Sequence, residues 1–349
     1  MLLARRDDVS VTEAVEHIVG LQAQAIMPPY HALFSRLEGF DPHELGRMIT
    51  DREVVRLTLM RGTVHLVTVR DALMLRPLVQ SVIERGFNSA FRRRIASVDL
   101  ERLSSATREI VETAIAPLTG REIARELLDR GIGDDVEAIG IAVRVYAPLV
   151  QVPPRGVWGK SGQAKYATLE SWTGRKQESQ PSIDDVVLRY LRAFGPASVM
   201  DVQTWSGLTK LRPVLERLRP QLVTFSAEDG TELFDMPDAP RPDADTPAPP
   251  RLLGQFDNVL LSHADRSRII PRQMAPWMDP ASGSRHVNSL LVDGMLRGTW
   301  WLERDGTLRI RSMAPLRRAE RAETEAEAER MLEFVAPAAQ TGAVRFEAH

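Results

Sequence analysis

The chain has 349 residues, of which 43% are hydrophobic and 26% charged, and its formal net charge is -2. This length predicts two to four folded units, and the near-neutral charge excludes a uniformly basic coat for nucleic acid. The absence of cysteine excludes disulfides, thiol nucleophiles and cysteine metal sites. No apolar run could span a bilayer and the start has no secretory-signal pattern, so we expect a cytoplasmic protein that does not bind membranes.

The first segment predicts short helices followed by a pair of strands. Apolar spacing and capping residues indicate helices at residues 11–19, 31–37 and 42–49. The first helix would end at Gly20. The stretches VVRLTLM and TVHLVTV are rich in β-branched residues and predict two strands, with a turn at Arg61-Gly62. Helices followed by a hairpin are typical of a winged helix.

The same pattern recurs twice. In the second copy, Thr119 and Glu122 form a predicted capping box, and LVQVPPR with KYATLESW predicts a hairpin. In the third copy, three helices precede a hairpin that turns at Asp229-Gly230. A long connecting helix is predicted at residues 70–95, and the other predicted helices of these two copies lie at residues 99–115, 138–149, 182–194, 198–208 and 209–221. The polar stretch 173–182 and the proline-rich stretch 238–250 read as linkers.

The last segment predicts a small β-rich domain with one charged helix. LLGQFDNVLLS, HVNSLLVDG, RGTWWLERD and TLRIRSM are expected to be strands, and residues 316–336 a helix. The predicted fold class is therefore α+β, with three tandem winged-helix units and a C-terminal β-rich domain. The expected boundaries are 1–98, with a long connecting helix, then 99–178, 179–240 and 251–349.

The stretch GLQAQ places two glutamines, Gln22 and Gln24, two residues apart beside apolar neighbours. On a helix they would point about 200° apart, whereas on an extended segment they would share a face. Gly20 before them and Pro28-Pro29 after them favour a break from helix, so we expect both amides to face one cavity. The alternative is that they cap backbone groups between helices.

Four stretches together resemble a known family: GLQAQ, RGTVHLVT, the predicted strand TLESW with Trp172, and FDNVLLSHADRSRII. They are similar to the winged-helix proteins that include the AlkZ-type DNA glycosylases, and Gln22-Ala23-Gln24 matches the family branch with a Gln-x-Gln signature. Family members usually begin with a fuller first helix, whereas in this sequence only the short stretch LLARRDD precedes the helix that leads into GLQAQ. The resemblance implies a monofunctional glycosylase that acts on bulky alkylpurines, including interstrand crosslinks, with a C-shaped array of winged helices around duplex DNA.

The chemistry of such a reaction explains why glutamines can suffice. Alkylation at purine N7 or N3 makes the base cationic, so that it leaves as a neutral molecule without a general acid. We expect Gln22 to orient the attacking water and Gln24 to support the water or the sugar. The scarcity of lysine argues against a Schiff-base lyase, and we expect no cofactor and no metal.

Further residues are candidates for contact with DNA. Arg61 and Thr63 lie at the predicted wing turn, where they would either contact a DNA phosphate or line the pocket beside Gln22. His65 is either a site residue or a structural histidine of the strand. In the C-terminal segment, Arg266 and Arg268 are candidates for phosphate contact, and the alternative is a salt-bridged turn. The resemblance implies that a hairpin of this segment contacts DNA, with the candidates Arg272, Trp277 and Arg285, and the alternative is a loop tip packed on its own domain. His263 and Asp265 form only a weak metal pattern.

We therefore expect a monomer that acts on double-stranded DNA carrying alkylated purines, in the bacterial cytoplasm and at the nucleoid. The alternative is a non-catalytic DNA-binding regulator built on winged helices. Such a regulator would have no need of the glutamine pair beside a wing.

Overall fold

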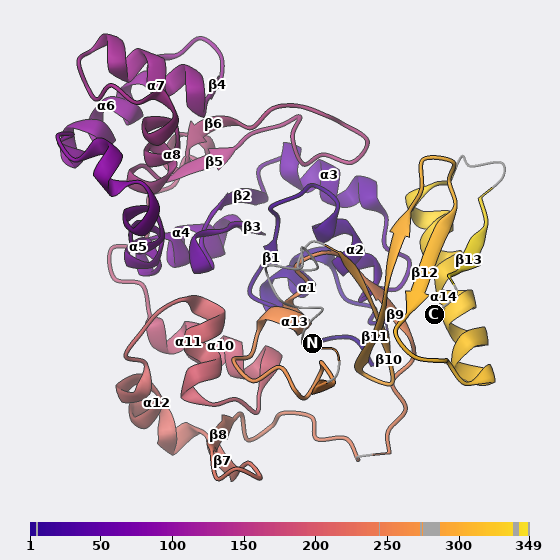
Figure 1. Cartoon of the computed structure of the whole chain (residues 1–349). Helices are drawn as coiled ribbons and strands as arrows, with labels where there is room; N and C mark the ends of the chain where they lie inside the picture. Colours follow the sequence, from indigo (N-terminus) through magenta and orange to yellow (C-terminus); the bar gives the residue numbers. More distant parts are fainter. Residues whose placement is uncertain (5, 244, 273, 275–286, 338–341, 348–349) are drawn as a thin grey trace. The chain divides into compact units, whose positions relative to one another are not determined.

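The computed structural model describes residues 1–349 except 5, 244, 273, 275–286, 338–341 and 348–349. It is a mixed α+β structure that divides by internal contacts into two units (Figure 1). The larger unit comprises Val15–Ile26 and Asp41–Pro237. The smaller unit comprises Met1–Ala14, Met27–Phe40 and Asp238–His349. The four predicted domain boundaries remain predictions.

The larger unit is organised around one sheet with the strand order β1-β3-β2-β5-β6-β4 (Figure 1). Its strands are β1 (Leu21–Gln22), β2 (Val54–Thr58), β3 (Val64–Thr68), β4 (Leu118–Thr119), β5 (Leu149–Gln151) and β6 (Lys165–Thr168). The first two predicted hairpins are thus β2–β3 and β5–β6. They are joined because β2 pairs antiparallel with β5, Arg56 opposite Gln151. All the neighbouring strands are antiparallel.

Several helices of the larger unit begin at a residue whose short polar side chain caps them. Asp41 accepts a hydrogen bond from the His43 amide at the start of α3, and Thr119 and Glu122 form the predicted capping box of α7. The first half of this unit contains α1 (Val11–His17, which starts in the smaller unit), α3 (Pro42–Thr50), η1 (Met60–Gly62), α4 (Val69–Leu78), α5 (Gln80–Ala90), η2 (Arg92–Ile95), α6 (Leu100–Thr113), α7 (Gly120–Asp129), α8 (Val136–Tyr146) and α9 (Leu169–Thr173).

The rest of the larger unit is the third predicted copy. It contains α10 (Ile183–Phe194), α11 (Val199–Ser206), α12 (Arg212–Leu218), η3 (Arg219–Gln221), β7 (Val223–Ser226) and β8 (Glu232–Asp235). Its core is aromatic, because Tyr190 packs against Phe194 and Trp205 with ring centroids 5.3 and 4.9 Å away. All three side chains are almost fully buried. The predicted hairpin around Asp229-Gly230 is confirmed as β7–β8.

The smaller unit contains a five-stranded sheet with the order β13-β12-β11-β10-β9. Its elements are α2 (Pro28–Phe34), β9 (Arg251–Leu253), α13 (Asn258–Leu261), β10 (Asn288–Val292), β11 (Met295–Leu302), β12 (Leu308–Ser312), α14 (Arg318–Val335) and β13 (Val344–Phe346). Trp300 on β11 and Met331 on α14 belong to one buried apolar cluster between the sheet and the helix. The sequence pattern predicted β10, β11, β12 and α14, but not β13.

Three predictions of local structure were wrong. Trp172 lies on α9 and not on a strand, because the Thr168 side chain accepts from the Ser171 amide and starts a helix there. LLGQFDNVLLS is not one strand: β9 ends at Leu253, and Asp257 caps the helix α13. The long helix predicted at 70–95 is interrupted at Val79, next to Pro77. In addition, α2 starts at Pro28, three residues before the predicted start.

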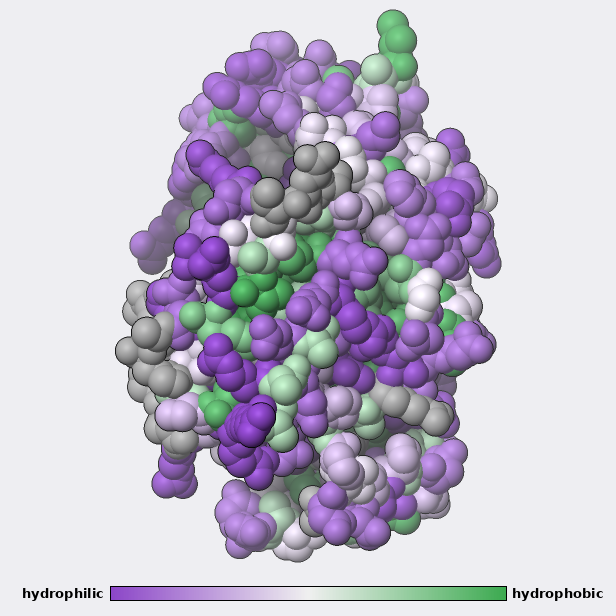
Figure 2. All heavy atoms as spheres, turned by 90° about the vertical axis from the view of Figure 1, so that its right-hand side faces the viewer, coloured by the Kyte–Doolittle hydropathy of each residue, from purple (hydrophilic) through white to green (hydrophobic). Residues whose placement is uncertain are grey.

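Figure 2 shows one face of the chain, on which hydrophilic side chains predominate and hydrophobic ones gather in limited patches. Among the described residues, no helix combines the length and the apolar character needed to cross a membrane.

Candidate active site at the glutamine motif

The glutamine motif follows a turn that only glycine can form. Gly20 has φ +88°, and its amide donates to the Val15 carbonyl at 2.9 Å, which closes the end of α1. A Cβ atom at Gly20 would lie 2.4 Å from Cγ1 of Val67 on β3. The chain can therefore turn out of the helix and lie directly against β3 at this point. The predicted break from helix is confirmed.

Gln22 lies on an extended segment that is held against β3. In the register of β1 and β3, Gln22 is opposite His65, and the next amide, that of Ala23, donates to the Val64 carbonyl at 2.7 Å. The Gln22 side chain is only 7% exposed. Its amide is therefore fixed by its neighbours rather than by water.

Arg61 holds the oxygen of that amide. One guanidinium nitrogen of Arg61 donates to Oε1 of Gln22 at 2.9 Å. The other terminal nitrogen donates to the Trp205 carbonyl in the last turn of α11. Arginine has no acceptor atom, so the Gln22 oxygen must face it and the Gln22 NH2 group must point away. The sequence predicted Arg61 at the turn and left two alternatives open, a DNA-phosphate contact and a place beside Gln22; the structure shows the contact with Gln22.

His65 lies behind this contact. Its Nδ1 is 3.0 Å from the Thr63 carbonyl and must carry the proton, since a carbonyl only accepts; Nε2 then offers its lone pair to Arg61 at 3.5 Å. His65 is 1% exposed. Burial, reinforced by the neighbouring Arg61 charge, lowers its pKa to about 3, against the opposing effect of the Thr63 bond. His65 is therefore neutral at physiological pH.

Gln24 is anchored differently. Its Oε1 accepts a hydrogen bond from the Val64 backbone amide at 3.1 Å, and its side chain is exposed. Both glutamines of the motif thus have their oxygens held by strand β3 or the turn before it. In the part of the chain that the structure describes, none of the groups bonded to the two amides is an acid.

A second arginine supports the motif and was missed by the sequence reading. Arg56 on β2 is 1% exposed, and it donates to the Ala23 carbonyl at 2.8 Å, between the two glutamines. Gly156, with φ +94°, packs against the Arg56 side chain, which a Cβ there would meet at 2.7 Å. The available signal was a charged residue in the middle of the apolar strand VVRLTLM, which calls for a buried partner.

The C-terminal candidates belong to the smaller unit. Arg268 and Arg272 are exposed and Arg266 is half-buried. Arg268 lies 3.4 Å from Nε2 of the buried His263. Trp277 and Arg285 lie outside the described residues. Among the described residues, no three histidine or acidic side chains come together in a group that could hold a metal ion.

The other motif of the resemblance, DNVLLSHADR, has a structural use in the smaller unit. Asp257 caps α13 by accepting from the Val259 amide at 3.0 Å. It also forms a two-pronged ion pair with Arg36, with both N–O distances at 2.8 Å and both side chains fully buried. Arg36 in turn donates to the carbonyls of Met1 and Ala32. This motif ties the chain's first residues to the segment before β10.

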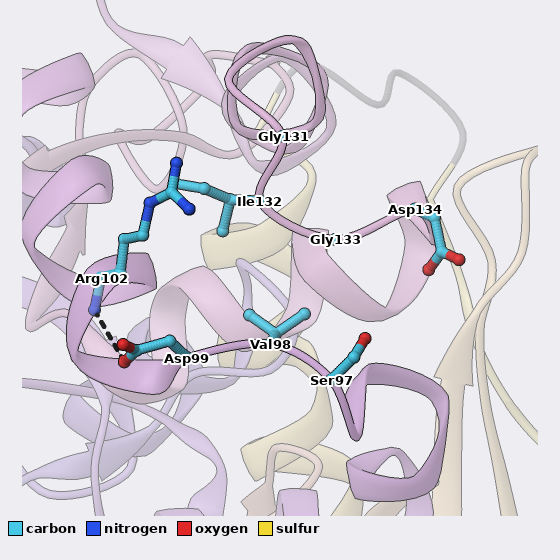
Figure 3. Close-up of a pocket in the computed structure, with 8 residues that line it drawn as sticks. All are labelled: Ser97, Val98, Asp99, Arg102, Gly131, Ile132, Gly133 and Asp134. Carbon is cyan, nitrogen blue, oxygen red and sulfur yellow. Dashed lines mark hydrogen bonds between the residues drawn. The ribbon is translucent and has the colours of Figure 1, made fainter.

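A pocket of about 280 Å³ lies elsewhere in the larger unit, at the start of α6 (Figure 3). It is lined by Ser97, Val98, Asp99, Arg102, Gly131, Ile132, Gly133 and Asp134. The Asp99 side chain caps α6 by accepting from the Arg102 amide (Figure 3). None of the predicted site residues lines this pocket, and its two aspartates do not suit a phosphate-bearing ligand.

The arrangement at the glutamine motif therefore offers neutral polar groups in fixed orientations. Within the described part of the chain, each amide keeps its NH2 group as a donor, and each amide oxygen keeps a second lone pair that can accept from a water molecule. Groups of this kind can orient a nucleophile and a sugar. They cannot protonate a leaving group, since an amide does not titrate near neutral pH.

Comparisons with known proteins identify the family of the chain and its fold. A family model described as DNA glycosylase AlkZ-like matches residues 15–334. The chain is 22% identical over 329 residues to the interstrand DNA cross-link repair glycosylase of Streptomyces sahachiroi, covering 85% of this chain and 84% of that protein. The solved structure of the Streptomyces sahachiroi DNA glycosylase AlkZ superposes with a TM-score of 0.78 at 20% identity, over 99% of this chain and 96% of that one.

Proposed function

Because the chain belongs to the AlkZ-like family of DNA glycosylases, we propose that it hydrolyses the N-glycosidic bond of N7- or N3-alkylated purines. Bulky adducts and interstrand crosslinks are included, because the Streptomyces sahachiroi relative is named for crosslink repair. The observation that carries the proposal is the neutral amide pair, Gln22 and Gln24, fixed on an extended segment.

The neutrality of the pair selects the substrate. A base alkylated at N7 or N3 is cationic, so its glycosidic bond already favours cleavage and the sugar develops oxocarbenium character. The water needs only to be held in line with the anomeric carbon, and positioning of this kind lowers a barrier by several kcal/mol. Gln22 orients the water through the free lone pair of Oε1, and Gln24 supports the water or the sugar. An unmodified purine, which needs protonation to leave, is not a substrate.

The same proposal covers the partner and the architecture. The partner is duplex DNA that carries alkylated purines, bound by a monomer through three tandem winged helices and a C-terminal domain. Arg61 and Thr63 line the site in the larger unit, and His65 supports them from within. Arg266, Arg268, Arg272, Trp277 and Arg285 contact DNA from the smaller unit. The enzyme is monofunctional and acts without lyase chemistry, cofactor or metal.

The test is release of free base from a duplex that carries N7-methylguanine, followed in single turnover and extended to bulkier N7 adducts and a crosslinked duplex. We expect the wild type to release the base, and the double variant Gln22→Ala, Gln24→Ala to be slower by about 100-fold or more. Gln221→Ala is the matched control, because Gln221 is exposed and lies far along the chain, on η3.

Two results would contradict the proposal in different ways. Release that is unchanged in the double variant would reject the roles of the glutamines. No release by the wild type from any of these substrates, together with intact DNA binding, would favour the non-catalytic regulator.

A further inference from the structure

The contacts of Arg61 go beyond what a DNA-phosphate contact requires. Three contacts of its guanidinium within the larger unit are to neutral acceptors: the Gln22 oxygen, the Trp205 carbonyl and, at a longer distance, the His65 ring. The first of these belongs to the amide that the proposed reaction needs. The second is a carbonyl in the last turn of α11, where helix carbonyls lack intrahelical donors and favour a positive charge.

The backbone at Arg61 is held in a conformation that side chains rarely adopt. Arg61 has φ +56° and ψ +15°, in the left-handed region, which is unfavourable for a residue other than glycine. Gly207, which ends α11, fits closely over this turn, since a Cβ on it would lie 3.3 Å from Arg61 Cα. Tertiary packing therefore fixes the backbone position of Arg61, and the bond to the Trp205 carbonyl of α11 fixes the position of its guanidinium.

His65 completes the orientation. Because its Nδ1 proton is committed to the Thr63 carbonyl, Nε2 can only accept, and it faces Arg61. Burial keeps the ring neutral. The donors and acceptors from Thr63 through His65 and Arg61 to Gln22 can be assigned in one consistent way, in which the Gln22 NH2 group points away from the Arg61 guanidinium.

We propose that Arg61 is the positioning residue of the active site: it donates to one lone pair of the Gln22 oxygen and so fixes the direction in which the second lone pair of that oxygen is offered to the attacking water. This inference rests on the proposed glycosylase function. It implies that Arg61 affects the rate of bond cleavage, and that it does so by holding Gln22. A phosphate contact would instead act on the affinity for DNA.

The test is a double-mutant cycle of Arg61→Gln and Gln22→Ala, with single-turnover base release and DNA affinity measured separately. We expect Arg61→Gln to slow base release by about 10- to 100-fold with the dissociation constant of DNA nearly unchanged, since a hydrogen bond to a charged group is lost. In the Gln22→Ala background, Arg61→Gln should slow release no further.

Two further variants separate positioning from charge and from folding. Arg61→Lys keeps the charge but not the fork that reaches Trp205 and Gln22 together, so we expect no recovery of rate. Arg85→Gln is the matched control, because Arg85 donates to the Gly207 carbonyl at 2.7 Å, beside the same end of α11, and is exposed. It should leave the rate unchanged.

The inference is overturned if the losses of rate at Arg61 and Gln22 multiply independently. It is also overturned if Arg61→Lys restores the rate, or if Arg61→Gln weakens DNA binding and lowers its salt dependence by one phosphate contact. Wild-type protein that releases no base would refute the proposed function instead. The same cycle measured by urea unfolding then decides the inference: non-additive stabilities support the contact and additive ones overturn it.

Discussion

Two arginines, Arg61 in the larger unit and Arg36 in the smaller one, are bonded to residues of two stretches that carry the family resemblance, GLQAQ and DNVLLSHADR, and their partners differ in charge. Arg36 is fully buried and bonded to a carboxylate, Asp257, with two further bonds to backbone carbonyls. Arg61 is part-buried and bonds to the neutral amide oxygen of Gln22.

The two pairs differ in the hydrogen-bonding groups that remain available to a ligand after the pair has formed. The Arg36–Asp257 pair directs its charges and donors inward, so the motif DNVLLSHADR stabilises the fold of the smaller unit. In the Arg61–Gln22 pair the acceptor is a neutral amide, whose oxygen keeps a second lone pair for another donor. A distinctive sequence motif therefore does not by itself indicate chemistry; the functional groups that remain available after folding do.

The largest effect on stability is expected when the Arg36–Asp257 ion pair is broken. Asp257→Asn keeps the shape of the side chain and its cap on α13, but removes the negative charge opposite Arg36. An unpaired buried charge costs about 3–5 kcal/mol of the free energy of unfolding, which urea titration measures. Glu38→Gln is the control in the same unit, because its pair with Arg330 is long, at 4.0 Å, and exposed. Equal losses in both variants would contradict the assignment.

A somewhat smaller loss of stability is expected when the backbone turn at Gly20, which positions Gln22, is changed. Gly20→Ala places a Cβ against Val67 at φ +88°, and strain and overpacking together should cost about 2–4 kcal/mol. Base release should also slow, since Gln22 moves with the turn. Gly174→Ala is matched, with φ +67° and open space around it, and should cost about 1 kcal/mol. Equal losses would show that the fit against β3 is unimportant.

The buried imidazole beside Arg61 gives a smaller effect that depends on pH. The pKa of His65 falls from 6.5 to about 3 on folding. Below pH 6.5 the unfolded chain takes up a proton that the folded chain refuses, so stability falls by about 1.4 kcal/mol for each pH unit; above pH 6.5 this contribution is constant. Urea unfolding at several pH values should show a shallower acid slope in His65→Asn. Identical slopes would contradict the burial of a neutral ring.

No effect of pH is expected on the single-turnover rate of the wild type. Glutamine does not titrate and His65 is already neutral, so the single-turnover rate on N7-methylguanine should be flat between about pH 5 and pH 9. Gln24→Asp introduces a carboxylate that can stabilise the oxocarbenium, and its profile should acquire an acid limb near about pH 4. A bell-shaped profile in the wild type would reveal a general acid or base and would reject catalysis by amides alone.

Local signals predicted much of this molecule. The capping box at Thr119 and the hairpins were recognised because their determinants lie within a few residues of one another. The extended conformation at Gln22 was predicted from Gly20 and the following prolines. Where local signals competed, as at Thr168 and Asp257, a helix cap outweighed β-branched and apolar neighbours.

What sequence could not predict is contact between distant segments. The Trp205 carbonyl that anchors Arg61 is 144 residues away, and Gln22 is 39 residues away on the other side. No periodicity encodes such a pairing, because it depends on how α11 packs against the turn at Arg61. The pairing of β2 with β5 was missed for the same reason.

That pairing limits how the protein can be divided. A fragment that stops at residue 98 would retain both glutamines, but it would leave β2 without β5 and expose a strand edge of the kind that invites aggregation. The shortest piece that keeps the whole sheet runs through Thr168. Exchanging the glutamine motif between relatives as a separate module would therefore fail unless the β5–β6 hairpin is exchanged with it.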